Sequence, residues 1–337
     1  MENFKEGKHK TSFERIIGTK SATEKKEVRK TLQQKLSRKE AKFKPFELIP
    51  TERDKEIIKI VSSITDKLIS FYGGKINHLP LNRLHIVKPG TVKKVTEGKF
   101  SKGLQSPIKQ AVIVEKESSE LQFSAILSHE LLHLKSYKSA QIDKNGDLIP
   151  YRSGLQSFSR KGDIIYFNSL EEAIVATTNQ IAFAEIKTRP IFKDEISEIE
   201  GIKNWLRDFY TKNNPTDKEA LEETIFEIIF IPESNKLLNF LQNSNESDEY
   251  KIGYLQGYLD IAKEIDNLVF AEREEERKKF YDLINDIIEK SNGEFKEWNE
   301  VFDIFAKANF SGNLMPLARL VEKTLGKGSF RKIAKEF

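Results

Sequence analysis

The chain has 337 residues, enough for one large domain or two ordinary domains with hydrophobic cores. Its charges nearly balance at a net +4, so composition favours neither nucleic acid nor a membrane surface as the main partner. The absence of cysteine excludes disulfides and leaves nitrogen and oxygen ligands for any metal site. With no apolar signal region and no apolar run near the ~20 residues of a membrane span, we expect a cytoplasmic protein. Secretion by a non-classical route stays open.

Residues 1–45 are basic, with 14 Lys/Arg against 6 Asp/Glu up to Lys44, and they carry few apolar positions. Such a composition predicts a flexible, solvated arm. No aromatic residue interleaves the charges from Ile17 to Lys42, so nucleic acid is not the expected partner. An acidic partner for the arm remains an alternative.

Residues 46–190 carry signals of both helices and strands and are predicted to form an α+β domain. Helices are indicated by apolar positions at helical spacing, and strands by short Ile/Val-rich segments. The predicted elements are a helix at 51–72, strands at 83–87 and 110–114, a buried helix from about 119, a hairpin at 139–155 turning at Asn145-Gly146, and a helix at about 169–186. A small sheet and two apolar helices are therefore expected at the centre of this domain.

Beyond residue 190 strand signals nearly vanish, and we predict a helical C-terminal subdomain over 191–337. Its predicted helices lie at 199–210, 218–231, 250–270, 271–290 and 315–337. Tyr250, Tyr254 and Tyr258 repeat every four residues, which is more typical of a core stripe than of a binding cleft. A substrate-side role for this stripe stays open.

The sequence His129-Glu130-Leu131-Leu132-His133 is an HExxH motif within the predicted buried helix. Residues four apart share a helix face, so both imidazoles can reach one metal ion, with Glu130 beside the metal-bound water. The alternative is two hydrogen-bonded core histidines and a carboxylate near the helix end. A helix this apolar favours the metal interpretation, because buried imidazoles and a buried carboxylate need partners.

A catalytic zinc site needs a third protein ligand. His9 lies in the arm, and His78 and His85 are interpreted as surface or hydrogen-bonded core histidines. Glu171 and Glu172 are the only charges from Ile164 to Ala184, so one of them is expected on the metal. If Asn168 or Ser169 caps this helix, both glutamates lie in its first turn, where the helix dipole offers an alternative explanation for them.

The motif followed by Leu170-Glu171-Glu172-Ala173 resembles the gluzincin type of zinc metallopeptidase. The resemblance covers about residues 80–186 and implies a zincin-like catalytic domain with bound Zn²⁺. It implies Glu172 as the third ligand, with Glu171 either supporting a ligand or exposed. The acidic residue that often follows the ligand by four positions is replaced here by Ala176.

The resemblance implies a hydrolase that cleaves a peptide or protein substrate. Zinc held by His129, His133 and Glu172 would activate water, with Glu130 as general base. Tyr166 is the first candidate for stabilising the oxyanion and Tyr151 the second, although each could be a packing tyrosine. Two other functions stay open: a weak or inactive zincin-like domain acting as a regulatory interaction module, and a binding protein acting through the basic arm.

Overall fold

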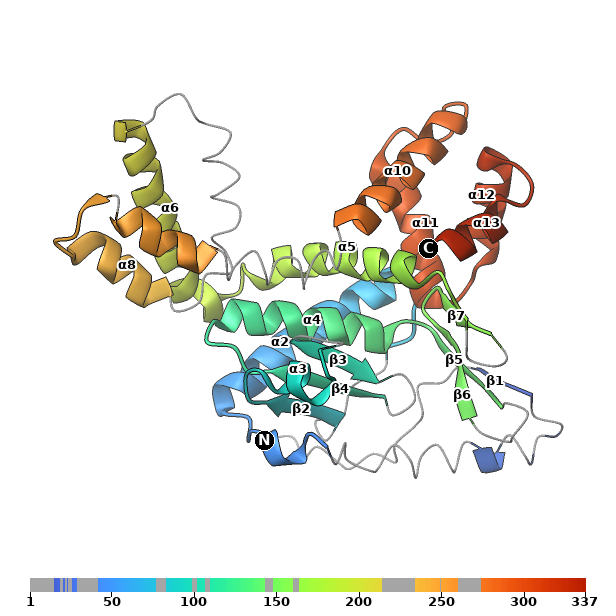
Figure 1. Cartoon of the computed structure of the whole chain (residues 1–337). Coiled ribbons are helices and arrows are strands. Elements are labelled where there is room, and N and C mark those ends of the chain that lie inside the picture. The colour runs from blue at the N-terminus through green and yellow to red at the C-terminus, as the bar shows by residue number, and fades with distance from the viewer. Residues whose placement is uncertain are drawn as a thin grey trace.

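The computed structural model describes residues 15–18, 21, 23, 26–28, 42–76, 83–98, 102–106, 110–142, 148–159, 164–213, 234–248, 250–259 and 274–337. Its architecture is α+β, with small sheets and a helical C-terminal region, as the sequence predicts (Figure 1). Three helices form the centre: α2 (Glu52–Phe71), α4 (Glu120–Lys135) and α5 (Asn168–Ile186). Helix α4 packs on a sheet and contacts both other helices, so it occupies the middle of the molecule.

The sheet beneath α4 has three strands in the order β2-β4-β3. Strands β2 (Leu84–Val87) and β4 (Ala111–Glu115) are parallel, and both confirm predicted strands. Strand β3 (Gly103–Ser106) runs antiparallel to β4 and forms an edge. It was not predicted, because its sequence begins with glycine and lacks β-branched residues. A short helix, α3 (Thr91–Val95), lies between β2 and β3.

A second sheet of five strands has the order β1-β5-β6-β7-β8. Its members are β1 (Arg15–Ile17), β5 (Lys138–Ile142), β6 (Leu148–Ser153), β7 (Gln156–Phe158) and β8 (Ile165–Tyr166). The antiparallel pairing of β5 with β6 confirms the predicted hairpin, whose turn at Asn145-Gly146 lies outside the described residues. Strand β1 pairs in parallel with β5, so this part of the predicted flexible arm belongs to a sheet.

The starts of α2 and α4 follow from local capping. Thr51 and Asp54 form a reciprocal capping box at α2. At α4, Ser119 Oγ accepts a hydrogen bond of 2.9 Å from the Gln122 N–H. Every residue of α4 after Glu120 is buried, so the helix has no polar face, as its composition predicts.

The start of α5 differs from the prediction. Neither Asn168 nor Ser169 caps the helix; its N-cap is Phe167, which has a left-handed backbone with φ +58° and makes no side-chain cap. The backbone N–H and the hydroxyl of Ser169 both donate to Phe337 O, at 2.8 and 2.9 Å. A segment distant in the sequence therefore caps α5, and only Glu171 of the two glutamates lies in the first turn.

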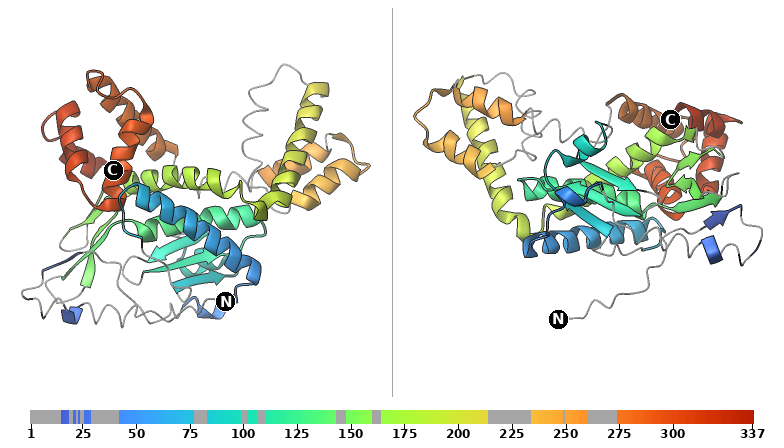
Figure 2. Two further views of the ribbon diagram at one scale, coloured as in Figure 1. Left: turned by 180° about the vertical axis from the view of Figure 1, so that it is seen from behind. Right: turned by 60° about the horizontal axis from the view of Figure 1, so that its bottom comes forward.

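The C-terminal helices form two groups at opposite ends of the central helices (Figures 1 and 2). The first group is α6 (Lys193–Asn213), α8 (Ser234–Asn243) and a helical segment at 250–259. The second is α10 (Glu274–Lys290), α11 (Trp298–Ser311), α12 (Met315–Leu325) and α13 (Ser329–Glu336). Helices α8 and α11 were not predicted. The helix predicted at 315–337 is divided at Gly326 (φ +94°) into α12 and α13. The helix predicted at 218–231 lies outside the described residues.

Two hydrophobic cores correspond to these two groups. The first core contains residues of the three-stranded sheet, of α2 and α4, and of the end of α5, and these pack against α6 and α8. The second core joins the start of α5 to α10, α11, α12 and α13. Short 3-10 helices at Lys44–Phe46 and Pro190–Phe192 lead into the folded part and into α6. Within the described ranges, no helix is both long and apolar enough to cross a bilayer.

Candidate metal centre

Three potential ligands meet where α4 lies against α5. His129 Nε2 and His133 Nε2, one helical turn apart, are separated by 3.0 Å. Glu172 Oε2 lies 3.0 Å from His133 Nε2 and 3.6 Å from His129 Nε2. In the part of the chain that the structure describes, these three residues form a group that could hold a metal ion.

The spacing of the three donor atoms fits one small ion. A tetrahedral ion with bonds of about 2.0–2.1 Å needs donors roughly 3.3 Å apart. The three observed separations, 3.0, 3.0 and 3.6 Å, bracket that value. Two imidazole nitrogens and one carboxylate oxygen are also a donor set that zinc accepts.

The electrostatics of the group also suit a cation. Burial opposes the charged form of Glu172, yet the two neighbouring imidazoles hold its pKa well below the ordinary value. Burial likewise opposes protonation of His133, but Glu171 and Glu172 raise its pKa well above the ordinary value. Positive charge is therefore favoured at this point, and a bound cation would take the place of the proton on His133.

Glu171 has a different position from its neighbour. Its side chain is almost fully buried, and its Oε2 and Oε1 lie 3.1 and 3.2 Å from His133 Nδ1. The carboxylate thus meets the ring nitrogen that does not face the group. The sequence left two alternatives for Glu171, an exposed carboxylate or a carboxylate that supports a metal ligand. The first is wrong, and the contact with His133 Nδ1 fits the second.

His129 lacks this kind of support. Its Nδ1 is buried and has no hydrogen-bond partner among the described residues. Ala176, which stands where the resembling family often has an acid, is buried and offers no side-chain acceptor. The two imidazoles of the group are therefore held unequally.

Glu130 lies against the edge strand of the three-stranded sheet. A Cβ atom added to Gly103 on β3 would be 2.5 Å from Glu130 Oε1 and 2.9 Å from its Cγ. A larger residue at this position would therefore force the Glu130 side chain to shift. Sequence reasoning missed Gly103, although a glycine inside a strand often marks a close approach of another group.

The two candidate tyrosines lie on the five-stranded sheet. Tyr166 on β8 is half-buried and packs against the second core, and Tyr151 on β6 is exposed. No hydrogen bond that the structure describes joins either ring to the three potential ligands. Arg152 is buried and donates to the carbonyls of Gly154, Ala308 and Gly312, so its guanidinium is engaged by the backbone.

Of the remaining histidines, His85 lies in the described part of the chain, and it is not a member of the group. His85 is buried and its Nδ1 lies 2.9 Å from Glu47 Oε1, which confirms the interpretation as a hydrogen-bonded core histidine. His9 and His78 lie outside the described residues.

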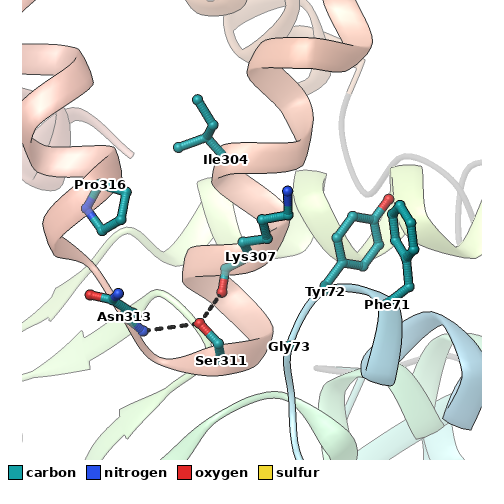
Figure 3. Close-up of a pocket in the computed structure, with 8 residues that line it drawn as sticks. All are labelled: Phe71, Tyr72, Gly73, Ile304, Lys307, Ser311, Asn313 and Pro316. Atoms are coloured by element: carbon teal, nitrogen blue, oxygen red, sulfur yellow. Dashed lines mark hydrogen bonds between the residues drawn. The ribbon is translucent and has the colours of Figure 1, made fainter.

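A pocket of about 300 Å³ opens between the end of α2 and helices α11 and α12 (Figure 3). Its lining is mainly apolar, with Tyr72, Ile304 and the stem of Lys307 among its walls. Burial and the charge of Asp303 raise the pKa of Tyr72 to about 12, so this phenol stays neutral. None of the three potential ligands lines this pocket, and it is separate from the candidate metal centre.

Comparison with known proteins adds no relative: no protein-family model, curated protein or solved structure matches the chain. The group formed by His129, His133 and Glu172 is therefore the main structural indication of function.

Proposed function

We propose that this protein is a zinc-dependent metallopeptidase of the gluzincin type, which hydrolyses peptide bonds of a protein or peptide. The observation that carries the proposal is the convergence of His129, His133 and Glu172 at tetrahedral spacing, with Glu130 next to the first histidine. A closed structural zinc site has four protein ligands and needs no carboxylate base. Three ligands and an adjacent glutamate are the composition of a hydrolytic site.

Bound zinc would supply Lewis acidity and lower the pKa of water toward neutrality. The protein's own contribution begins with Glu130, whose carboxylate takes a proton from the attacking water. The same carboxyl group then gives a proton to the leaving amine. Because Glu130 is only 8% exposed and is bounded by Gly103, its carboxylate has little freedom to turn away.

The position of β3 favours a peptide as substrate. It lies at one edge of the three-stranded sheet, and its first residue lies against the proposed base. An extended peptide pairing with this edge would gain backbone hydrogen bonds and lie alongside Glu130. This arrangement suits a polypeptide better than a small ester or sugar.

Stabilisation of the oxyanion is assigned to Tyr166, with Tyr151 as the second candidate. A phenol can donate a hydrogen bond to the developing negative charge. Replacing each tyrosine with phenylalanine distinguishes the two candidates. The variant that lacks the stabilising phenol should have a kcat lower by about 10²–10³-fold, the range for loss of one such donor. The other replacement should leave kcat nearly unchanged.

The test uses the full chain purified with zinc. We expect about one zinc per chain by metal analysis, lost in His129→Ala and His133→Ala. Glu130→Gln should keep the zinc but lose hydrolysis by about 10²–10⁴-fold, the usual contribution of a general base.

The substrate is sought by comparing the new protein termini produced in a proteome by the wild type and by Glu130→Gln. Zinc binding without any termini specific to the wild type would instead support the regulatory interaction module. A double His129→Ala, His133→Ala protein that keeps full zinc would end the metal interpretation.

A further inference from the structure

His133 is held at two points, whereas His129 is not. Glu171 Oε2 lies 3.1 Å from the ring Nδ1 of His133. At the other end of the same residue, Lys138 Nζ donates a hydrogen bond of 2.7 Å to the backbone oxygen of His133. Within the described ranges, the ring Nδ1 of His129 has no hydrogen-bond partner.

Lys138 is an unusual residue at this position because its side chain is almost fully buried. It lies at the start of β5, directly after α4, and also donates to Ser153 Oγ at 3.2 Å. Burial lowers its pKa to about 8, and the charge of Glu171 opposes this shift. Both buried charged groups contact His133, Glu171 at the ring Nδ1 and Lys138 at the backbone oxygen, and their attraction opposes the cost of burying Lys138.

The turn that covers Glu171 is fixed from the C-terminal helices. Gly154, between β6 and β7, has φ +58°, and a Cβ atom there would lie 2.9 Å from Glu171 Oε1 and would also clash with Asn309. Asn309 on α11 accepts from the Leu155 N–H at 2.7 Å and donates to Ser136 Oγ at 3.2 Å. One buried amide thus ties the turn to the end of α4.

We infer that Glu171 and Lys138 are positioning residues for the metal ligand His133, and that Asn309 makes helix α11 part of the metal centre. The inference rests on metal binding by the group in the proposed function, but it does not require peptidase activity. A carboxylate on Nδ1 keeps the proton there and directs the Nε2 lone pair toward the ion. Lys138 compensates the charge of Glu171 and holds the last turn of α4 in place.

The first experiment measures metal affinity and geometry in the full chain. Zinc affinity is obtained by competition with a chromophoric chelator, and the ligand geometry from the d–d absorption of bound Co²⁺. Glu171→Leu should weaken zinc by about 10–100-fold, the usual effect of removing such a partner, and shift the Co²⁺ spectrum. Glu171→Gln keeps an acceptor for the Nδ1 proton, so it should recover part of the affinity.

Glu185→Gln is the matched control, because Glu185 lies on the same helix near its far end and is partly exposed. It should change neither zinc affinity nor the Co²⁺ spectrum. If Glu171→Leu behaves like this control while the wild type binds both ions, the inference is wrong and the proposed function survives. A wild type that binds neither ion overturns both.

The second experiment tests the coupling of the two charges. Lys138→Met should weaken zinc in the wild-type background, because Glu171 is left buried without its compensating charge. In the Glu171→Gln background the same change should have a smaller effect, since the charge to be compensated is gone. Equal effects in both backgrounds would show that Lys138 acts independently of Glu171.

Asn309→Ala should weaken zinc by several-fold and move the Co²⁺ spectrum in the same direction as Glu171→Leu. Leu237→Ala, in the buried face of α8, serves as its stability control. That variant should unfold more easily without any change in the Co²⁺ spectrum. If both variants lose affinity only in proportion to stability, α11 has no specific role at the metal centre.

Discussion

Two glycines from different parts of the molecule lie against the two carboxylates that neighbour the candidate ligands, Glu130 and Glu171. Gly103 faces Glu130 from β3, in a sheet formed by residues 84–115. Gly154 faces Glu171 from the turn after β6, which Asn309 on α11 holds in place. The proposed base is thus bounded by neighbouring sequence, whereas the support of a ligand depends on distant helices. Chemistry and metal binding should be separable by substitutions on these two sides.

The largest combined effect on stability and zinc binding is expected for Gly154→Ala. Its φ of +58° disfavours any residue with a Cβ, and the added methyl group would displace Asn309 and Glu171. Strain and overpacking together should lower the free energy of unfolding by about 2–4 kcal/mol. Zinc affinity should fall as well, because Glu171 can no longer rest against His133. Chemical denaturation and chelator competition measure the two effects.

Leu237→Ala provides the matched comparison from the first core. Truncating this buried leucine should cost about 2–5 kcal/mol of stability, similar to Gly154→Ala. Zinc affinity of the folded protein should stay at the wild-type level. Equal losses of affinity in both variants would mean that the two cores are not distinct with respect to the metal centre.

On the sheet side, Gly103→Ala should act on chemistry and leave the metal in place. The backbone of Gly103 has no positive φ, so the cost comes from the contact with Glu130 Oε1 at 2.5 Å. Displacing a base from its position should reduce kcat by about 10–100-fold, part of the full contribution of a general base. A Gly103→Ala variant with normal kcat but weaker zinc binding would contradict the proposal that Gly103 affects the base and Gly154 affects the metal.

The first core was largely predictable because its elements carry local signals. Helix α2 has apolar residues at helical spacing, α4 is apolar on all sides, and both begin at local caps. Strands β2 and β4 are short segments of mainly Ile, Val and Leu or Ala. Strand β3 was missed because only its pairing with β4 makes it a strand. Local sequence is therefore sufficient where a segment specifies its own conformation, and insufficient where a neighbour does.

The candidate site divides in the same way. The spacing of His129 and His133 is a local property of one helix, so the sequence alone could place them together. The choice between Glu171 and Glu172 needed the family pattern, because it depends on the rotation of α5 against α4. The contacts of Lys138 and Asn309 were beyond prediction, since they depend on packing between segments far apart in sequence.

An acid titration tests whether the first core is independent of the metal centre. Burial opposes the charge of Asp54, but hydrogen bonds from Lys116 and Thr51 lower its pKa below the ordinary value. A depressed carboxyl pKa stabilises the fold above its unfolded value near 4, and that stability is lost as pH falls through the folded pKa. Asp54→Asn should therefore cost about 1 kcal/mol at pH 7, as for loss of a helix cap. Its stability should then depend less on pH below about pH 4.

Zinc affinity at pH 7 should not change in Asp54→Asn, because Asp54 lies at the start of α2 and contacts none of the ligands. Urea denaturation from pH 2 to 7 gives the stability, and chelator competition gives the affinity. A pH profile identical to that of the wild type would show that Asp54 has no depressed pKa in the folded protein.

The smallest effect is expected in the first group of C-terminal helices, where Gly253→Ala should increase stability. Gly253 lies in the helical segment at 250–259, is exposed, and has nothing within 4 Å of an added Cβ atom. Gly253→Ala should raise the free energy of unfolding by about 0.5–1 kcal/mol, because glycine loses more backbone entropy than alanine in a helix. Zinc affinity and hydrolysis should stay unchanged. A Gly253→Ala variant less stable than the wild type would mean that another helix or a bound partner approaches this face closely. A change in kcat would support the alternative that Tyr250, Tyr254 and Tyr258 form part of the substrate site.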